Sequence, residues 1–136
     1  MPLETTVAVR YRDLDPMGHV NNAVYATLFE EARNAFFREV VGTELAETDA
    51  VLASLSVEFH APVDGTDPVP VAVWVPTLGE TSCTFGYEVR TADGDRAATG
   101  ETVLVTLDDD GEPVPLPDAL REAAAAYDDP PTPTER

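Results

Sequence analysis

Five stretches of the chain alternate between hydrophobic and polar side chains, which is the pattern of a β-strand with one buried face. The first stretch covers residues 5–12 and places Val7, Val9 and Tyr11 on the buried side. The other four stretches cover residues 54–59, 71–75, 83–90 and 102–107. Turn residues separate these four, and one of the turns, Asp93-Gly94, is a good two-residue hairpin signal. Consecutive strands with short connections predict an antiparallel sheet.

A long helix is predicted over residues 24–40, between the first strand and the other four. Arg33 falls largely on the polar side of this helix, and Gly42 stands where a C-terminal cap is expected. The apolar side is a stripe with steps of four residues, formed by Val24, Leu28, Ala32, Phe36 and Val40 and widened by Tyr25, Phe29 and Phe37. Such a face requires a sheet to pack against.

The order of these elements predicts one α+β domain over residues 1–127, in which a five-stranded antiparallel sheet wraps one long central helix. The segment PDALREAAAAY adds a short C-terminal helix with Pro117 near its start. Residues 128–136, DDPPTPTER, have the composition of a flexible acidic and proline-rich tail. Trp74 and Leu104 are assigned to the outer face of the sheet, where we expect a partner subunit to cover part of the surface.

The charge of the chain limits the kinds of molecule that it can bind and indicates the environment in which it works. The 26 acidic residues outnumber the 8 basic ones, all arginines, and the net charge of −18 disfavours binding to nucleic acid or to an anionic membrane. At about 1 M salt the Debye length falls to roughly 3 Å, which removes most of the self-repulsion of such a chain. We therefore favour a protein from a high-salt cytoplasm, such as that of a haloarchaeon. An acidic mesophilic protein stays open as the alternative.

The sequence contains no signal of export or membrane insertion. No apolar run approaches the length of a bilayer-spanning helix, and the N-terminus lacks the basic and then apolar pattern of a signal peptide. The single Cys83 excludes an intramolecular disulfide. We expect a cytoplasmic protein.

The segment YRDLDPMGHVNNAVYATLFEEAR, residues 11–33, joins the first strand to the helix and holds the candidate chemistry. Asn21 or Asn22 is placed to cap the helix, whose N-terminal amides can polarise a carbonyl oxygen. Asp15 lies just upstream as a possible nucleophile or general base, and Gly18 allows a tight turn between them. A carboxylate facing amide donors is the minimum equipment for hydrolysing an activated acyl group. The same residue types are also typical of an ordinary strand-to-helix turn, so the residues alone leave both interpretations open.

Other catalytic chemistries lack their usual residues. His19 and His60 are the only histidines, and with one cysteine they make a zinc site improbable. The chain has neither a Gly-x-Ser-x-Gly elbow nor a glycine-rich phosphate loop. We therefore expect no metal and no redox cofactor.

The segment at residues 11–33 resembles the signature of the 4-hydroxybenzoyl-CoA thioesterase-like acyl-CoA thioesterases of the hot-dog superfamily. In that family an Asp-x-x-Gly-His-Val-Asn-Asn-x-x-Tyr loop leads into the central helix. The segments SLSVEFHAPV, FGYEVR and ATGETVLVTLDDDGEPVPLPDALREA also resemble the family, so the similarity covers roughly residues 4–127. The resemblance implies the hot-dog fold, which agrees with the architecture predicted above.

The resemblance also implies roles for individual residues. Asp15 is the catalytic carboxylate, as nucleophile or as base, and the backbone amide of Asn22 polarises the thioester carbonyl. Asp13 is not the motif aspartate and is interpreted as a loop hydrogen-bonding or surface group. The other motif matches, expected to shape the substrate site, are Gly18, His19, Val20, Asn21 and Tyr25. The phosphates of CoA often meet basic side chains in this family, and the candidates are Arg33, Arg90 and Arg96.

The implied reaction is hydrolysis of an acyl-CoA to a carboxylic acid and free CoA. Family members usually form dimers whose sheets join edge to edge, often paired into tetramers, so a homodimer or homotetramer is expected. Two other functions stay open: a hydratase or dehydratase of the same fold, and a non-catalytic module that binds acyl thioesters. The sequence does not specify the acyl group, nor whether CoA or an acyl-carrier protein carries it.

Overall fold

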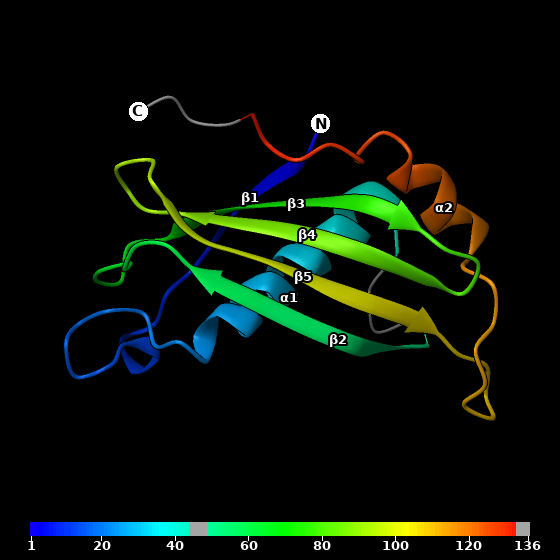
Figure 1. The fold of residues 1–136 in the computed structure, drawn as a ribbon, viewed down its shortest axis with the longest axis horizontal. Coiled ribbons are helices and arrows are strands. Elements are labelled where there is room, and N and C mark those ends of the chain that lie inside the picture. The colour runs from blue at the N-terminus through cyan, green and yellow to red at the C-terminus, as the bar shows by residue number, and fades with distance from the viewer. Residues whose placement is uncertain (44–48, 133–136) are drawn as a thin grey trace.

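The computed structural model describes residues 1–43 and 49–132 of the chain. Five antiparallel strands form one sheet in the order β1-β3-β4-β5-β2 (Figure 1). Their bounds are Leu3–Val7 for β1, Ala50–Phe59 for β2, Val69–Leu78 for β3, Ser82–Arg90 for β4 and Arg96–Thr106 for β5. The five-stranded antiparallel sheet predicted from the sequence is confirmed. Of the nine residues of the predicted tail, the last four lie outside the described residues.

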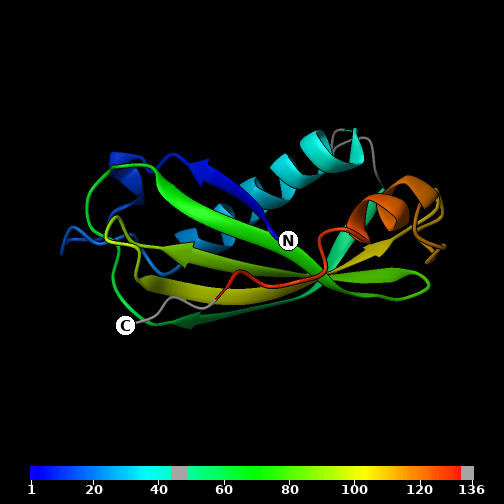
Figure 2. The same ribbon diagram turned by 90° about the horizontal axis from the view of Figure 1, so that it is seen from above.

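The predicted long helix lies along one side of the sheet (Figure 2). Helix α1 spans Val24–Phe36 and continues into a π-helical turn, η2, at Phe37–Val41. Gly42 then ends the helix with a φ of 91°, a left-handed conformation that glycine adopts without strain. The short C-terminal helix α2 spans Asp118–Ala124. The two predicted helices and the glycine cap are confirmed. Among the described residues, none of the helices has the length and hydrophobicity that crossing a membrane requires.

Aromatic rings join α1 to the middle of the sheet. The ring of Phe29 stacks on that of Tyr87 in β4, with centroids 4.4 Å apart and planes within 8° of parallel. A Cβ atom at Gly100 in β5 would overlap the Phe29 ring, so the missing side chain allows this close contact. The helix is thereby fixed over β4 and β5, and its N-terminus is held at one end of the sheet.

The first strand is shorter than predicted. It ends at Val7, and the chain then enters a 3-10 turn, η1, at Tyr11–Asp13. The Asp13 carboxylate accepts hydrogen bonds from both the backbone and the side chain of Arg10, and these bonds replace strand pairing at this point. Val9 is buried as predicted, but Tyr11 is 86% exposed, so its assignment to the buried face was wrong.

The assignment of Leu104 to the outer face of the sheet was also wrong. Leu104 pairs with the buried Cys83 and lies in the core. The residues of β5 that face the core are therefore shifted by one position from those predicted. Thr102 and Thr106 share this inner face because their hydroxyl groups have partners there, the Tyr87 hydroxyl at 2.6 Å and the Val114 carbonyl at 2.7 Å. Trp74 does lie on the outer face, partly buried and close against Gly86.

Candidate active site

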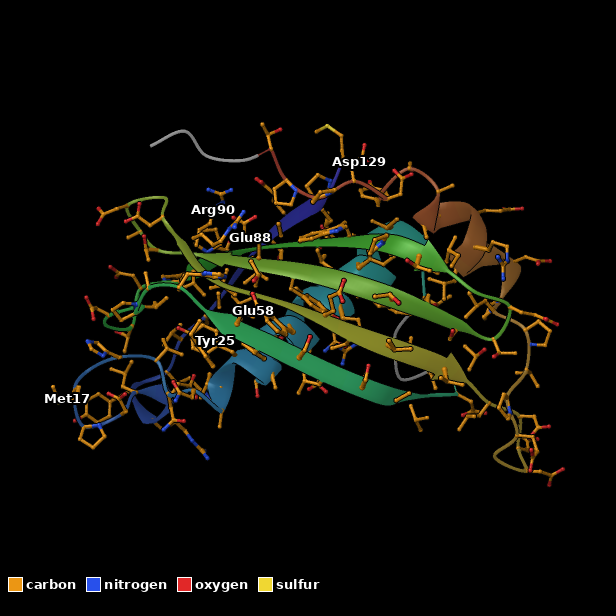
Figure 3. All side chains as sticks on the ribbon, viewed as in Figure 1. Met17, Tyr25, Glu58, Glu88, Arg90 and Asp129 are labelled. Atoms are coloured by element: carbon orange, nitrogen blue, oxygen red, sulfur yellow. The ribbon has the colours of Figure 1, made fainter. Side chains whose placement is uncertain are left out.

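The Asp15 loop is a tight reversal between η1 and α1. The Asp15 amide donates to the carbonyl of His19 at 2.7 Å, and the Gly18 amide donates to the carbonyl of Asp15 at 3.0 Å. Gly18 has a φ of 79°, which a residue with a side chain rarely adopts. The reversal places Met17 at the tip of the loop, away from the body of the molecule (Figure 3). The role predicted for Gly18 in turning the backbone is confirmed.

The carboxylate of Asp15 is held by the same loop. Its Oδ1 atom accepts hydrogen bonds from the backbone amides of Met17 at 2.8 Å and His19 at 3.1 Å. Within residues 1–43 and 49–132, no donor engages its Oδ2 atom. One oxygen therefore orients the carboxylate, and the other is available for chemistry.

Asp13 anchors the loop instead of lining the site. Its carboxylate binds the Arg10 guanidinium at 3.0 Å, and its carbonyl accepts a hydrogen bond from the Asn21 amide at 2.8 Å. The hydrogen bonds from the Arg10 side chain and backbone hold the pKa of the Asp13 carboxyl below its ordinary value. The interpretation of Asp13 as a loop hydrogen-bonding group is confirmed.

The N-cap position of α1 is Ala23, and no side chain caps the helix there, so the prediction that Asn21 or Asn22 caps it was wrong. Asn21 instead closes the turn that precedes the helix. The side-chain oxygen of Asn21 accepts a hydrogen bond from the Ala23 amide at 2.9 Å, and its carbonyl accepts one from the Val24 amide at 2.9 Å. Asn22 lies between them with its side chain exposed. In the part of the chain that the structure describes, the backbone N–H of Asn22 has no acceptor. It is a free donor at the N-terminal end of the helix.

One pocket brings most of these residues together. It has a volume of about 310 Å³, and the predicted residues that line it are Asp15, His19, Val20, Asn22 and Tyr25. Tyr25 is buried, its ring packs edge-to-face on that of Phe59 at 5.2 Å, and its burial raises the pKa of its hydroxyl. Gly18 and Asn21 act on the pocket through the loop and the helix start. The pocket therefore combines a carboxylate, a free amide donor and an aromatic wall.

The other wall was not predicted. Phe59, His60, Ala61 and Pro62, at the end of β2 and the turn after it, also line the pocket. In the sequence these residues are only the end of an alternating stretch and the turn after it. In the structure the order of the strands places that end beside the start of α1. The His60 ring lies 3.0 Å from the hydroxyl of Thr99, which holds it at the edge of the sheet.

His19 ties the loop to the same turn. Its Nε2 atom lies 3.1 Å from a carboxylate oxygen of Asp64, and the two residues also form a backbone bridge. The Val20 amide donates to the carbonyl of Val63 at 2.8 Å. The C-terminal side of the loop that carries Asp15 is thus fastened to the turn that follows β2.

The three arginines proposed for the CoA phosphates do not gather at this pocket. Arg33 is only 3% exposed and donates to the Tyr87 hydroxyl at 3.0 Å, so its assignment to the polar side of the helix was wrong. The Tyr87 hydroxyl gives the guanidinium an acceptor inside the protein, although the Nε atom of Arg33 is buried without a hydrogen-bond partner in the described residues. Arg90 and Arg96 lie 2.9 Å and 3.5 Å from the carboxylate of Glu88. Glu88 and Arg90 appear side by side on the outer face of the sheet in Figure 3. A contact of Arg90 or Arg96 with CoA stays a prediction.

This arrangement suits attack on a carbonyl carbon. The Asn22 amide could donate to the carbonyl oxygen, and the free oxygen of Asp15 could attack the carbon or remove a proton from water. Within the described residues, no three histidine, cysteine, aspartate or glutamate side chains gather where they could hold a metal ion.

The fold and the site define a class of protein, and comparison with known families identifies it. The model of the thioesterase-like superfamily matches residues 9–124. This match includes the Asp15 loop, α1 and the whole pocket wall, so the chain belongs to that superfamily.

Individual relatives share both the fold and much of the sequence. A thioesterase from Thermus thermophilus, solved with coenzyme A and Zn, is 41% identical with a TM-score of 0.80, covering 94% of this chain and 95% of that one. A DHNA-CoA thioesterase from Staphylococcus aureus is 25% identical with a TM-score of 0.83, over 92% of this chain and 89% of that one. The acyl-CoA thioester hydrolase YbgC of Escherichia coli is 27% identical over 106 residues, which are 75% of this chain and 79% of that protein.

Proposed function

We propose that the protein is an acyl-CoA thioesterase, which hydrolyses an acyl-CoA thioester to a carboxylic acid and free CoA. The observation that carries the proposal is that one pocket holds the Asp15 carboxylate and Asn22, whose amide has no partner among the described residues. The names of the relatives support the substrate class, because several of them are acyl-CoA or aryl-CoA thioesterases.

In the proposed reaction the thioester carbonyl oxygen accepts a hydrogen bond from the Asn22 amide. This bond strengthens as negative charge develops on the oxygen, and so it stabilises the transition state more than the bound substrate. In one route Oδ2 of Asp15 attacks the carbonyl carbon, CoA leaves as its thiolate, and water hydrolyses the mixed anhydride. In the other route the carboxylate takes a proton from water, and the water oxygen attacks directly. Both routes end in the same acid and thiol and use no metal or redox cofactor.

A single turnover in ¹⁸O-labelled water tests for the nucleophilic route. Label found in the carboxyl group of Asp15 after one turnover requires an anhydride intermediate that water attacks at the Asp15 carbon. Label found only in the released acid is the result of the general-base route and also of an anhydride that water attacks at the acyl carbon. Incubation with EDTA should leave the rate unchanged, and a loss restored by a divalent metal would contradict the proposed chemistry.

We further propose a homodimer joined through β2, which can pair into a tetramer. β2 is an edge strand bonded only to β5, and it exposes four large apolar side chains by 42–51%: Val51, Leu52, Leu55 and Phe59. Phe59 also lines the Asp15 pocket, so a partner on this edge would border the active site. Light scattering should give a mass of at least twice the chain, and replacing Leu55 by aspartate should lower it.

We also propose that the protein works in a high-salt cytoplasm. The net charge of −18 opposes both the compact fold and the binding of polyanionic CoA unless salt screens it. The melting temperature should therefore rise between dilute buffer and molar KCl. Equal or greater stability in dilute buffer would contradict this proposal.

The function itself is tested with a panel of acyl-CoA substrates in molar KCl, with free thiol as the readout. Thiol release supports the thioesterase. Hydration of an enoyl-CoA without thiol release would instead indicate a hydratase, and tight binding without turnover would indicate a binding module.

A further inference from the structure

The arginines of this chain differ in whether other groups of the protein engage them. Four of the described arginines form ion pairs: Arg10 with Asp13, Arg33 with Glu30, and both Arg90 and Arg96 with Glu88. A fifth, Arg121, has no carboxylate partner among the described residues but donates to the carbonyl of Gly79 at 2.7 Å.

Two arginines remain, and both are exposed. Within residues 1–43 and 49–132, only Arg12 and Arg38 have neither a carboxylate within 4.0 Å nor a side-chain hydrogen bond to the backbone. Because acidic residues outnumber basic ones 26 to 8, an arginine with neither an ion pair nor a side-chain hydrogen bond is unusual in this chain.

Arg12 and Arg38 lie at opposite ends of α1. Arg38 is in the η2 turn, beyond the C-terminal end of the helix. Arg12 is in the η1 turn, three residues before Asp15, so the Cα atoms of Arg12 and Asp15 lie within about 11 Å of each other in any conformation. One unpaired cation therefore stands beside the proposed active site, and a matched one stands far from it.

The turn that carries Arg12 is fixed in place. Asp13 accepts hydrogen bonds from the Arg10 side chain at 3.0 Å and 3.3 Å and from the Arg10 amide at 2.8 Å. The Asn21 amide joins the same turn to the start of α1. A fixed backbone lowers the entropy that binding must remove, so the turn presents its side chains at a lower cost than a mobile loop would.

The residue that precedes Arg12 in the chain is aromatic. Tyr11 is 86% exposed, more than any other large hydrophobic side chain of the described residues. An exposed ring and an exposed guanidinium on the same turn are a combination that can bind a nucleotide, because the ring stacks on a base and the guanidinium donates to phosphate oxygens. The nucleotide end of CoA carries both an adenine and phosphate groups.

We propose that the Tyr11–Arg12 turn binds the nucleotide end of the CoA substrate, with Arg12 on a phosphate and Tyr11 against the adenine. This inference rests on the proposed thioesterase function. It adds the residues that recognise the CoA part of the substrate, as distinct from its acyl group. The pantetheine arm of CoA joins the thioester at Asp15 to the nucleotide at the turn. Arg12, and not the buried Arg33, is then the cation that selects the CoA thioester.

The test compares two thioesters of the same acyl group, one on CoA and one on N-acetylcysteamine, which lacks both phosphates and adenine. The readout is the ratio of kcat/KM for the CoA thioester to that for the short thioester, in the wild type and in Arg12→Gln and Arg38→Gln. Both variants lose one positive charge, so the change in net charge is the same. We expect Arg12→Gln to lower the ratio roughly three- to tenfold, through KM for the CoA thioester, and Arg38→Gln to leave it unchanged.

Tyr11 is tested in the same assay with two substitutions. Tyr11→Leu removes the aromatic ring and should also lower the ratio, whereas Tyr11→Phe retains the ring and should keep it. A loss of kcat on both thioesters in Tyr11→Phe would assign the hydroxyl to the chemistry and contradict the stacking role.

The possible failures are distinguishable. If the wild type hydrolyses the CoA thioester but Arg12→Gln and Arg38→Gln give the same ratio, the nucleotide site is wrong and the thioesterase function stands. If Arg12→Gln slows both thioesters equally, Arg12 supports the loop instead of binding phosphate, and the inference is again overturned. If the wild type hydrolyses neither thioester, the proposed function is wrong and the inference falls with it.

Discussion

The backbone amide of Asn22 can be removed without removing the residue around it. Asn21 to Val24 form a turn closed by the hydrogen bond from the Val24 amide to the Asn21 carbonyl at 2.9 Å. Asn22 is the second residue of that turn, and Ala23, the third, has φ −70° and ψ −20°, which fits a type I turn. Proline is favoured at the second position of such turns. The substitution Asn22→Pro therefore deletes the N–H donor with little strain on the backbone.

The expected effect follows from the role of the donor. The Asn22 N–H has no partner in the described residues, so its loss breaks no hydrogen bond within them, and the free energy of unfolding should change little. Loss of one oxyanion donor costs about 2.7–4 kcal/mol of transition-state stabilisation, which corresponds to a fall in kcat of about 10²–10³-fold. The matched control is Asn22→Ala, which retains the N–H and removes only an exposed side chain.

The assay measures kcat for thiol release by both variants, with thermal unfolding as a check on folding. We expect Asn22→Ala to remain within about threefold of the wild type and Asn22→Pro to lose at least a hundredfold, with similar melting temperatures. If Asn22→Pro is folded and its kcat matches that of Asn22→Ala, the amide of Asn22 does not stabilise the transition state.

Three further predictions concern stability and reactivity. Because Arg10 lowers the pKa of Asp13 in the folded protein, their pair stabilises the fold above the unfolded pKa of about 4, and this contribution is lost as the pH falls through the lower folded pKa. Asp13→Asn should therefore lower the urea midpoint at pH 7 and have less effect in acid; an equal effect at both pH values would contradict the pairing. Cys83 is buried, with a pKa raised to about 12, so a thiol reagent should label it only on unfolding, and rapid labelling of the native protein would refute this placement. Gly100→Ala forces a methyl group against the Phe29 ring and should cost about 1–3 kcal/mol, seen as a fall of several degrees in melting temperature; an unchanged melting temperature would show that the ring can move away.

The strands and the long helix could be predicted because their hydrophobic periods are regular. The stripe at steps of four residues identified α1, and strict alternation located the four later strands, β4 almost in full and about half of each of the other three. The end of the first strand was predicted wrongly because local hydrogen bonds compete with pairing in the sheet. The hydrogen bonds from Arg10 to Asp13 turn the chain at a position where alternation alone continued.

The sequence could not predict which residues of β5 face the core, for a similar reason. Thr102 and Leu104 are both inside, so hydrophobicity does not distinguish the two faces of the strand. The Tyr87 hydroxyl, which satisfies Thr102, belongs to another strand and becomes visible only in the folded structure. The burial of Arg33 could not be predicted either, because nothing in the sequence distinguishes a guanidinium buried beside that hydroxyl from an ordinary surface charge.

One half of the candidate site could be predicted from the sequence, and the other half could not. The residues around Asp15 are contiguous, and the rules for turns apply to them directly, although the predicted asparagine cap of α1 is absent from the structure. Phe59 and His60 reach the pocket only because β2 ends beside the start of α1, which depends on the strand order. The exposed side chain of Tyr11 was likewise hidden by its place in an alternating stretch.

The central claim is that the Asp15 carboxylate performs the chemistry, and Asp15→Asn tests it most directly. The side-chain oxygen of asparagine can accept the same hydrogen bonds from Met17 and His19, so the loop should keep its shape while the reactive oxygen is replaced by an amide nitrogen. Thiol release from a good acyl-CoA substrate in molar KCl is the measurement, and the buried Cys83 should add no background. The account predicts a folded variant with activity lowered at least a hundredfold, of the order expected when a general base or nucleophile is removed. A folded Asp15→Asn variant that releases thiol as fast as the wild type would contradict it.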